Sequence, residues 1–191
     1  MRRWPLPTFV VISLLSLAAC GHSDGPFDIA IIGSKDDVFA SGLRLSEGAQ
    51  GVRGATGAGL VALDAQGEIE PALADRWIVT DDGKSYIFRL REGTWPDGAD
   101  LSGESAHDAL RQAIRGLRGT SLALDLAPLD EVRMMAGRVV EIDLKAPMPD
   151  FLRLLAQPEL ALAHRGFQAG PMGIDQAHKS TEWANKPIEL T

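Results

Sequence analysis

The sequence predicts an α/β fold. Residues 85–91 and 140–145 alternate apolar and polar side chains, as half-buried strands do. Between these two segments, residues 101–114 place apolar side chains at helical spacing. About 170 residues follow a predicted leader, which is enough for one domain with a hydrophobic core. The order of helix and strand patterns therefore favours an α/β domain.

The leader is predicted at residues 1–19. It has a basic start, an apolar run too short to span a bilayer, and the sequence Leu17-Ala-Ala-Cys20. This pattern predicts a lipoprotein signal peptide, with Cys20 as the lipidation site, and the alternative is an incidental thiol after an ordinary signal peptide. Cys20 is the only cysteine, so no disulfide is expected. From this signal we expect the protein to be exported and anchored to a membrane through Cys20, facing the periplasm or the outer cell surface.

The charge excludes one class of partner. The formal net charge is −7, and removal of residues 1–19 leaves 17 basic against 26 acidic side chains. Because nucleic-acid binding requires a basic face, nucleic acid is not an expected partner.

The next segments are a tether, a strand and a loop. Residues 20–26 are a short polar tether, and Phe27-Asp-Ile-Ala-Ile-Ile-Gly33 has the apolar character of a buried strand that ends at glycine. Residues 34–59 contain glycine at every third position from 48 to 57. We predict a mobile surface loop here, since so much glycine disfavours a helix.

The middle of the chain gives clearer patterns. Tyr86, Phe88 and Leu90 should point to one face of the first alternating strand, and Val140, Ile142 and Leu144 to one face of the second. The helix over 101–114 should begin at Ser102 as N-cap, with Glu104 in its first turn.

Several motifs in order resemble one family. The segments "PALADRW" (71–77), "DGKSYIFRLREG" (82–93), "WPDG" (95–98), "APMPDFL" (146–152) and "LAQP" (155–158) keep the order and gaps seen in that family. On these residues the chain resembles the extracellular solute-binding proteins, family 5, of oligopeptide, dipeptide and nickel ABC importers. Ser105 stands where the family often has Asp, which predicts a weaker helix cap.

The resemblance implies part of a type II periplasmic-binding-protein lobe, which is a mixed sheet with flanking helices, with the second lobe absent, as in an N-terminal fragment. It implies residues 27–59 as the start of the large subdomain of lobe 1, 60–165 as its small subdomain, and 166–191 as a truncated re-entry into the large subdomain. The implied function is a lipid-anchored substrate-binding component of an ABC importer for peptides or similar small solutes, and not an enzyme. A stand-alone lipoprotein interaction module without transport activity is the alternative.

The resemblance also implies partners and a ligand site. The partners are a peptide or other small solute, an ABC permease, and the membrane through the lipid anchor. Gly33, Ser34 and Lys35 leave the first strand where relatives hold ligand in the cleft between lobes, and we predict ligand contact there. The alternative is a plain turn at the end of the strand.

Other candidate sites are interpreted as structural. Gly57–Ala62 imitates a dinucleotide fingerprint but lacks a preceding buried strand. His107 and Asp108, with Ser102 and Ser105, suggest a hydrolase only weakly, and an exposed helical face is preferred. No histidine pair has metal-ligand spacing, so His164 and His178 are expected on the surface and no metal or cofactor is predicted. Trp77 and Trp95 could line a ligand cleft, but core packing is preferred.

Overall fold

The computed structural model describes residues 27–31, 45–170, 172, 174–176 and 188–190. Its helices and strands confirm the predicted α/β class with flanking helices, and every strand pair in the described part of the chain is antiparallel. The elements are β1 (Phe27–Ile29), α2 (Glu47–Thr56), β2 (Val61–Leu63), β3 (Ile69–Pro71), β4 (Ala74–Val79), β5 (Ser85–Leu90), α3 (Gly103–Gly116), α4 (Ser121–Asp125), β6 (Leu129–Met134), β7 (Val139–Leu144), α5 (Phe151–Leu155), η2 (Pro158–Leu160), β8 (Ala163–His164), β9 (Phe167–Gln168), β10 (Ile174–Gln176) and β11 (Ile188–Leu190).

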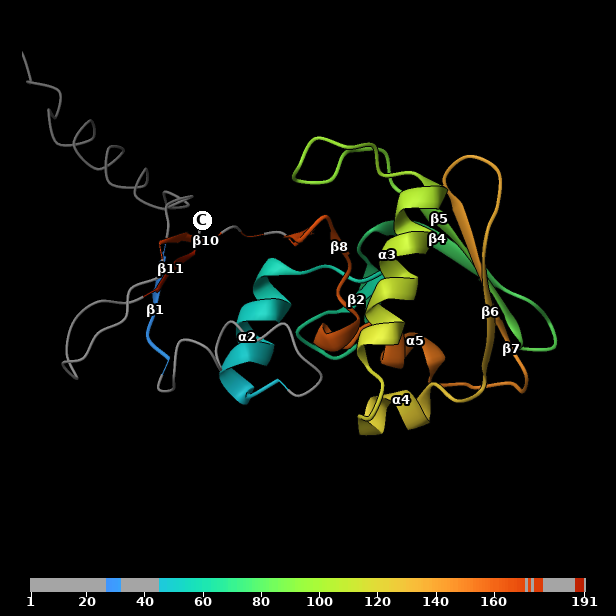
Figure 1. Cartoon of the computed structure of the whole chain (residues 1–191). Coiled ribbons are helices and arrows are strands. Elements are labelled where there is room, and N and C mark those ends of the chain that lie inside the picture. Colours follow the sequence, from blue (N-terminus) through green and yellow to red (C-terminus); the bar gives the residue numbers. More distant parts are fainter. Residues whose placement is uncertain (1–26, 32–44, 171, 173, 177–187, 191) are drawn as a thin grey trace, which may run out of the picture.

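A four-stranded sheet in the order β4-β5-β7-β6 forms the largest layer, and α3 packs across one of its faces (Figure 1). The predicted alternation is confirmed, because the side chains expected on one face of β5 and of β7 are all buried: Tyr86, Phe88, Leu90, Val140, Ile142 and Leu144. Ala106, Ala109 and Leu110 on α3 are buried against the same core. Trp95 also belongs to this core, as predicted, and the partly buried Trp77 packs on Phe88 at its edge.

The start of α3 confirms Ser102 as its N-cap and corrects the expectation of a weak cap. The Ser102 hydroxyl accepts a hydrogen bond from Ser105 N at 3.1 Å, and Ser105 Oγ accepts one from Ser102 N at 3.0 Å. Serine therefore closes a reciprocal capping box at this position. Ser105 Oγ also accepts a hydrogen bond from Trp95 Nε1 at 2.9 Å, which ties the helix start to the core.

The prediction of a loop over residues 34–59 is wrong where the structure describes that segment, because α2 occupies Glu47–Thr56. Ser46 caps it by accepting a hydrogen bond from Ala49 N at 3.2 Å. Glycine costs about 1 kcal/mol per helix position, but most helical stability in proteins comes from tertiary packing. Here Val52 is buried in a cluster with Ile29, Ile31, Ala55 and Met172, which compensates for the glycines.

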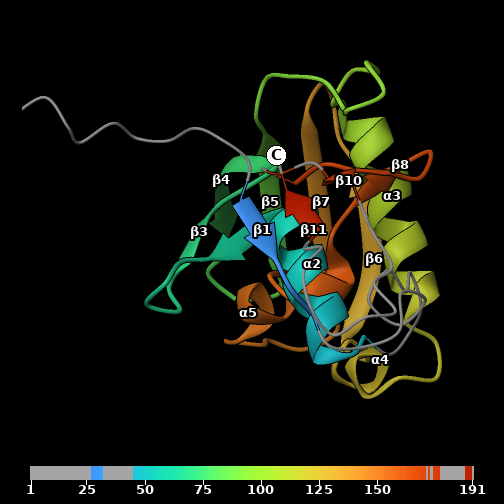
Figure 2. The ribbon, with the colours of Figure 1, turned by 90° about the vertical axis from the view of Figure 1, so that its left-hand side faces the viewer.

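A three-stranded sheet in the order β1-β11-β10 lies at the other end of the molecule, and α2 lies between the two sheets (Figure 1). Figure 2 views the molecule from the side of β1 and shows these strands in front of α2. Phe27 pairs with Leu190 and Ile29 with Ile188, so strands from the two ends of the described chain meet here. None of the described helices is long and apolar enough to cross a membrane.

Two chain segments connect the sheets and run against each other. Ala55, Thr56 and Ala58 carbonyls accept hydrogen bonds from Met172 N (3.3 Å), Gly170 N (2.8 Å) and Leu162 N (2.9 Å). At Gly170 the two backbones approach so closely that a Cβ atom would collide with the carbonyl group of Thr56. Only glycine permits this approach.

Candidate ligand-binding site

The predicted ligand segment Gly33–Lys35 follows closely on β1 but lies outside the described residues, so its role stays a prediction. The structure does describe what precedes it. Ile29 and Ile31 pack against Val52 of α2. The strand residues that precede the predicted site are therefore packed against α2. Cys20 and the tether also lie outside the described residues.

One cluster of polar side chains joins the "WPDG" turn to the hairpin of β8 and β9. His164 Nδ1 lies 2.8 Å from Asp97 Oδ2, and the His164 ring stacks on Trp95 with centroids 5.4 Å apart and an interplanar angle of 24°. The His164 side chain is 20% exposed, so it lies only partly at the surface. His178 and His22 lie outside the described residues.

The carboxyl group of Asp97 is stabilised in its ionised form. Partial burial by itself would raise the pKa of Asp97, but hydrogen bonds from Ala99 N and from His164, with the nearby charges of His164 and Arg165, outweigh it. The pKa of Asp97 therefore lies below its ordinary value. This arrangement holds a turn and a hairpin together and leaves Asp97 unsuited to donate a proton near neutral pH.

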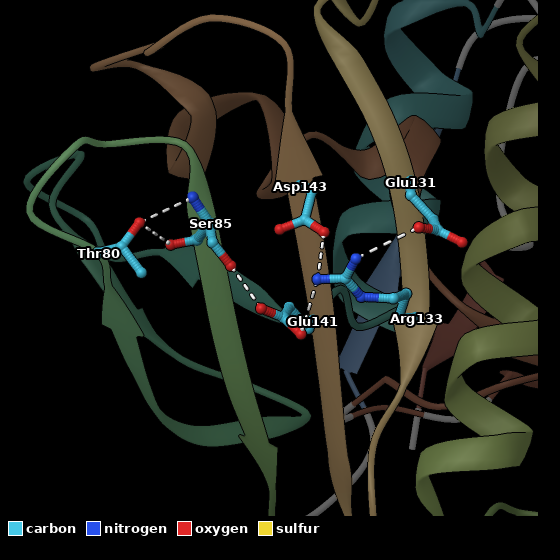
Figure 3. A network of polar contacts seen from close by, with 6 residues as sticks. All are labelled: Thr80, Ser85, Glu131, Arg133, Glu141 and Asp143. Carbon is cyan, nitrogen blue, oxygen red and sulfur yellow. Dashed lines mark hydrogen bonds and ion pairs between the residues drawn. The ribbon is translucent and has the colours of Figure 1, made fainter.

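Another cluster of polar side chains lies on the outer face of the four-stranded sheet, the face that points away from α3 (Figure 3). Arg133 Nη2 lies 3.2 Å from Glu141 Oε2 and also contacts Asp143 Oδ2, while Arg133 Nη1 lies 3.3 Å from Glu131 Oε2. The Ser85 hydroxyl donates a hydrogen bond to Glu141 Oε1 at 2.7 Å. The hydrogen bond from Ser85, followed by the one from Arg133, lowers the pKa of Glu141.

The side chains that suggested a hydrolase have structural roles. His107 Nδ1 lies 3.0 Å from Oδ1 of its neighbour Asp108, while Ser102 and Ser105 form the helix cap. Asp108 is exposed, as predicted, and the His107 side chain is partly buried at 17% exposure. The four side chains therefore do not form a nucleophile–base–acid relay.

The structure also shows where the dinucleotide-like segment lies and whether the described residues could hold a metal ion. Gly57–Ala62 leads into β2 and follows a helix, which is the reverse of the strand-to-helix order that a dinucleotide fingerprint needs. Among the described residues, no group of three or more His, Cys, Asp or Glu side chains could hold a metal ion.

Comparison with known proteins gives a consistent result. Residues 68–189 match the family described as bacterial extracellular solute-binding proteins, family 5 Middle. A probable deoxycholate-binding periplasmic protein of Escherichia coli K12 is 33% identical over 120 residues, which are 53% of this chain and 22% of the relative. The oligopeptide-binding protein OppA of Bacillus subtilis is 27% identical over 184 residues, which are 81% of this chain and 34% of the relative.

Solved structures show the same fold at lower identity. A periplasmic oligopeptide-binding protein of Borrelia burgdorferi superposes with a TM-score of 0.65 at 21% identity, over 77% of this chain and 36% of that one. NikA of Brucella suis, in complex with Fe(III)-EDTA, superposes with a TM-score of 0.63 at 20% identity, over 85% of this chain and 37% of that one. The chain spans between a fifth and about a third of the length of the curated relatives it matches.

Proposed function

Because the chain belongs to the bacterial extracellular solute-binding proteins of family 5, we propose that it acts as a substrate-binding component of an ABC importer for peptides or similar small solutes. The observation that carries the proposal is the family match over residues 68–189, which coincides with a fold shared with known binding proteins. The polar clusters of the described residues serve as a helix cap, a turn contact and a sheet-surface network.

The two sheets correspond to two subdomains in this proposal. Residues 60–165 form the small subdomain of the first lobe, and residues 27–59 and 166–191 belong to the large subdomain. The separate hydrophobic clusters around Phe88 and around Val52 support this division. Ligand binding in such a receptor is closure of two lobes, in which ligand stabilises the closed state.

The ligand contact from this lobe is proposed at Gly33, Ser34 and Lys35. An extended peptide can pair with backbone groups at the end of a strand much as an added strand does. Among the described strands, β1 lies at one edge of the order β1-β11-β10, and an edge strand can offer backbone groups for pairing.

Cys20 is proposed as the lipid attachment site that anchors the exported protein to a membrane. The Cys20→Ser variant tests this proposal in the producing bacterium. We expect the wild-type protein in the membrane fraction with a mass increased by acyl groups, and the variant without them. Equal acylation of both proteins would refute the assignment of Cys20.

The binding proposal is tested on the protein as its bacterium makes it, isolated with an antibody raised against residues 60–165. Isothermal titration calorimetry with tri-alanine and with a pool of mixed tripeptides measures binding directly. We expect affinity in the micromolar range or better for the native protein. We expect residues 21–191 alone to bind weakly or not at all, because one lobe cannot close around a ligand.

A second measurement follows uptake of labelled tri-alanine in cells. Loss of the gene should reduce uptake, and the intact gene should restore it. Absence of both peptide binding and any change in uptake would refute the peptide assignment. Micromolar binding by residues 21–191 alone would refute the two-lobe mechanism while leaving the substrate class intact.

A further inference from the structure

Among the described residues, the outer face of the β4-β5-β7-β6 sheet is partly exposed and has an uneven distribution of charge. The inner face is filled by α3 and the core, whereas Ile78 on the outer face is 64% exposed. Strand register defines which side chains share this outer face. Arg76 pairs with Arg89, Ile78 with Ile87, and Ile87 in turn with Glu141.

The basic end of the outer face consists of Arg76 and Arg89, both exposed and directly opposite each other on β4 and β5. Like charges placed opposite one another across strands are destabilising. Asp75 offsets part of this charge, since its Oδ1 lies 4.0 Å from Arg76 Nε. An acidic surface placed against these two guanidinium groups would offset the remaining repulsion.

The acidic end lies diagonally opposite, on β7 and β6, and contains Glu131, Glu141 and Asp143 around Arg133 (Figure 3). Three carboxylates surround one guanidinium group, so this end carries an excess of negative charge. Ile78 and Ile87 lie between the two ends, next to each other in the register. One face therefore contains a basic end, an apolar centre and an acidic end.

We propose that the outer face of the β4-β5-β7-β6 sheet associates with the same face of a second copy of this chain. A two-fold axis between the two sheets, perpendicular to the line from the basic to the acidic end, places each basic end opposite the partner's acidic end. The two isoleucines then pack against their counterparts. An isologous interface requires this self-complementarity, and a single face supplies it. The strands of the two copies cross at a large angle, as in orthogonal sheet packing.

The outer face, and not a sheet edge, is the surface available for association. The edge strands β4 and β6 each contain a register irregularity, at Ala74/Arg76 and at Leu129/Glu131, and each edge carries charged side chains. Bulges and charges of this kind prevent strand addition at an edge.

The size of the face makes the association weak and reversible. Four strands about 4.8 Å apart and six residues of about 3.4 Å each give a face on the order of 400 Å² per copy. Stable complexes bury roughly 800 Å² per partner. Association should therefore require high local concentration, and it should weaken with salt because exposed charges are screened.

Charge exchange tests the proposal on the full chain, purified in a nonionic detergent and followed by sedimentation velocity at low and high salt. The variant Arg76→Glu/Arg89→Glu makes both ends acidic, and Glu131→Arg/Asp143→Asn makes both ends basic. We expect each variant alone to self-associate at least about tenfold more weakly than wild type. An equimolar mixture should recover association, because each basic end again meets an acidic one.

The matched control is Arg111→Glu/Arg115→Glu, which makes the same charge change on exposed positions of α3 and should leave association unchanged. Recovery in the mixture also shows that both variants are folded. Failure of wild type to associate up to the millimolar range would overturn the proposal, as would association unchanged by the Arg76 and Arg89 substitutions. In cells, a photoreactive residue at position 87 should cross-link two copies; a cross-link only to a different protein would also overturn it.

Discussion

The closest approach between the two connecting segments gives the most demanding prediction for the fold. Gly170 N donates a hydrogen bond to the carbonyl oxygen of Thr56 at 2.8 Å, and Met172 N donates one to Ala55 at 3.3 Å. A Cβ atom on residue 170 would lie inside the van der Waals radii of the Thr56 carbonyl carbon and oxygen. Both neighbours are backbone atoms, so no side-chain rotation relieves the overlap in Gly170→Ala.

The cost of this substitution follows from two terms. Restoring normal contact distances requires the two backbones to separate by about 1 Å or more, since non-bonded carbon atoms prefer 3.5–4.0 Å. Overpacking of this kind costs about 1–3 kcal/mol. The two backbone hydrogen bonds contribute about 0.5–1.5 kcal/mol each, and separation of the segments breaks them. We expect Gly170→Ala to lower the stability of this junction by about 2–6 kcal/mol.

Amide hydrogen exchange is the decisive assay, because the core around Phe88 can stay folded while the junction opens. We expect protection of amides in α2 to fall by a factor of about 30 or more. The control is Gly54→Ala in the same helix, where an added methyl meets nothing within 4 Å. It should stabilise α2 by about 1 kcal/mol. Unchanged protection of α2 in Gly170→Ala would refute the reasoning.

Three further predictions concern side chains. His164→Ala should lower the midpoint of thermal unfolding, since it removes an aromatic stack on Trp95 worth about 0.5–1.5 kcal/mol and the contact with Asp97; an unchanged midpoint would contradict a role in holding the hairpin. At pH values above 4.5, the ordinary pKa of Glu141, the ionised Glu141 side chain should stabilise the fold, and this contribution should be lost as pH falls through its lower folded pKa. In urea unfolding across this pH range, the free energy of unfolding should depend less on pH in Ser85→Ala than in wild type, and an identical pH dependence would count against this role. Tyr86→Phe should cost about 1 kcal/mol in urea unfolding, because Tyr86 Oη donates a hydrogen bond to Met148 O at 2.9 Å; a stabilised variant would refute this.

The parts of the fold that the sequence predicted are those with a local signal. Alternation along β5 and β7 identified the buried face of each strand because side chains of a strand point alternately to its two sides. Ser102 and the apolar spacing after it identified the start of α3, because a serine side chain can cap the first turn and helical spacing places apolar side chains on one face. In each case, neighbouring residues in sequence contain the whole pattern.

The parts that were missed depend on contacts between distant residues. Glycine propensity argued against α2, and the packing of Val52 on Ile29, Ile31 and Met172 outweighed it. Asp97 and His164 are 67 positions apart, so no spacing rule could pair them. The stacking of His164 on Trp95 depends on how β8 returns past the "WPDG" turn, which only the folded chain determines.

The contacts of α2 indicate how the proposed small subdomain can affect the proposed ligand segment. Backbone hydrogen bonds connect Leu162, Gly170 and Met172 to residues 55–58, at and just after the C-terminal end of α2. The same helix packs through Val52 on Ile29 and Ile31, just before the segment 33–35. A displacement of the segment that contains Leu162 and Gly170 must therefore shift α2 or break these hydrogen bonds. Since α2 contacts the strand that leads to the proposed site, substitutions at the junction should change ligand affinity without touching ligand.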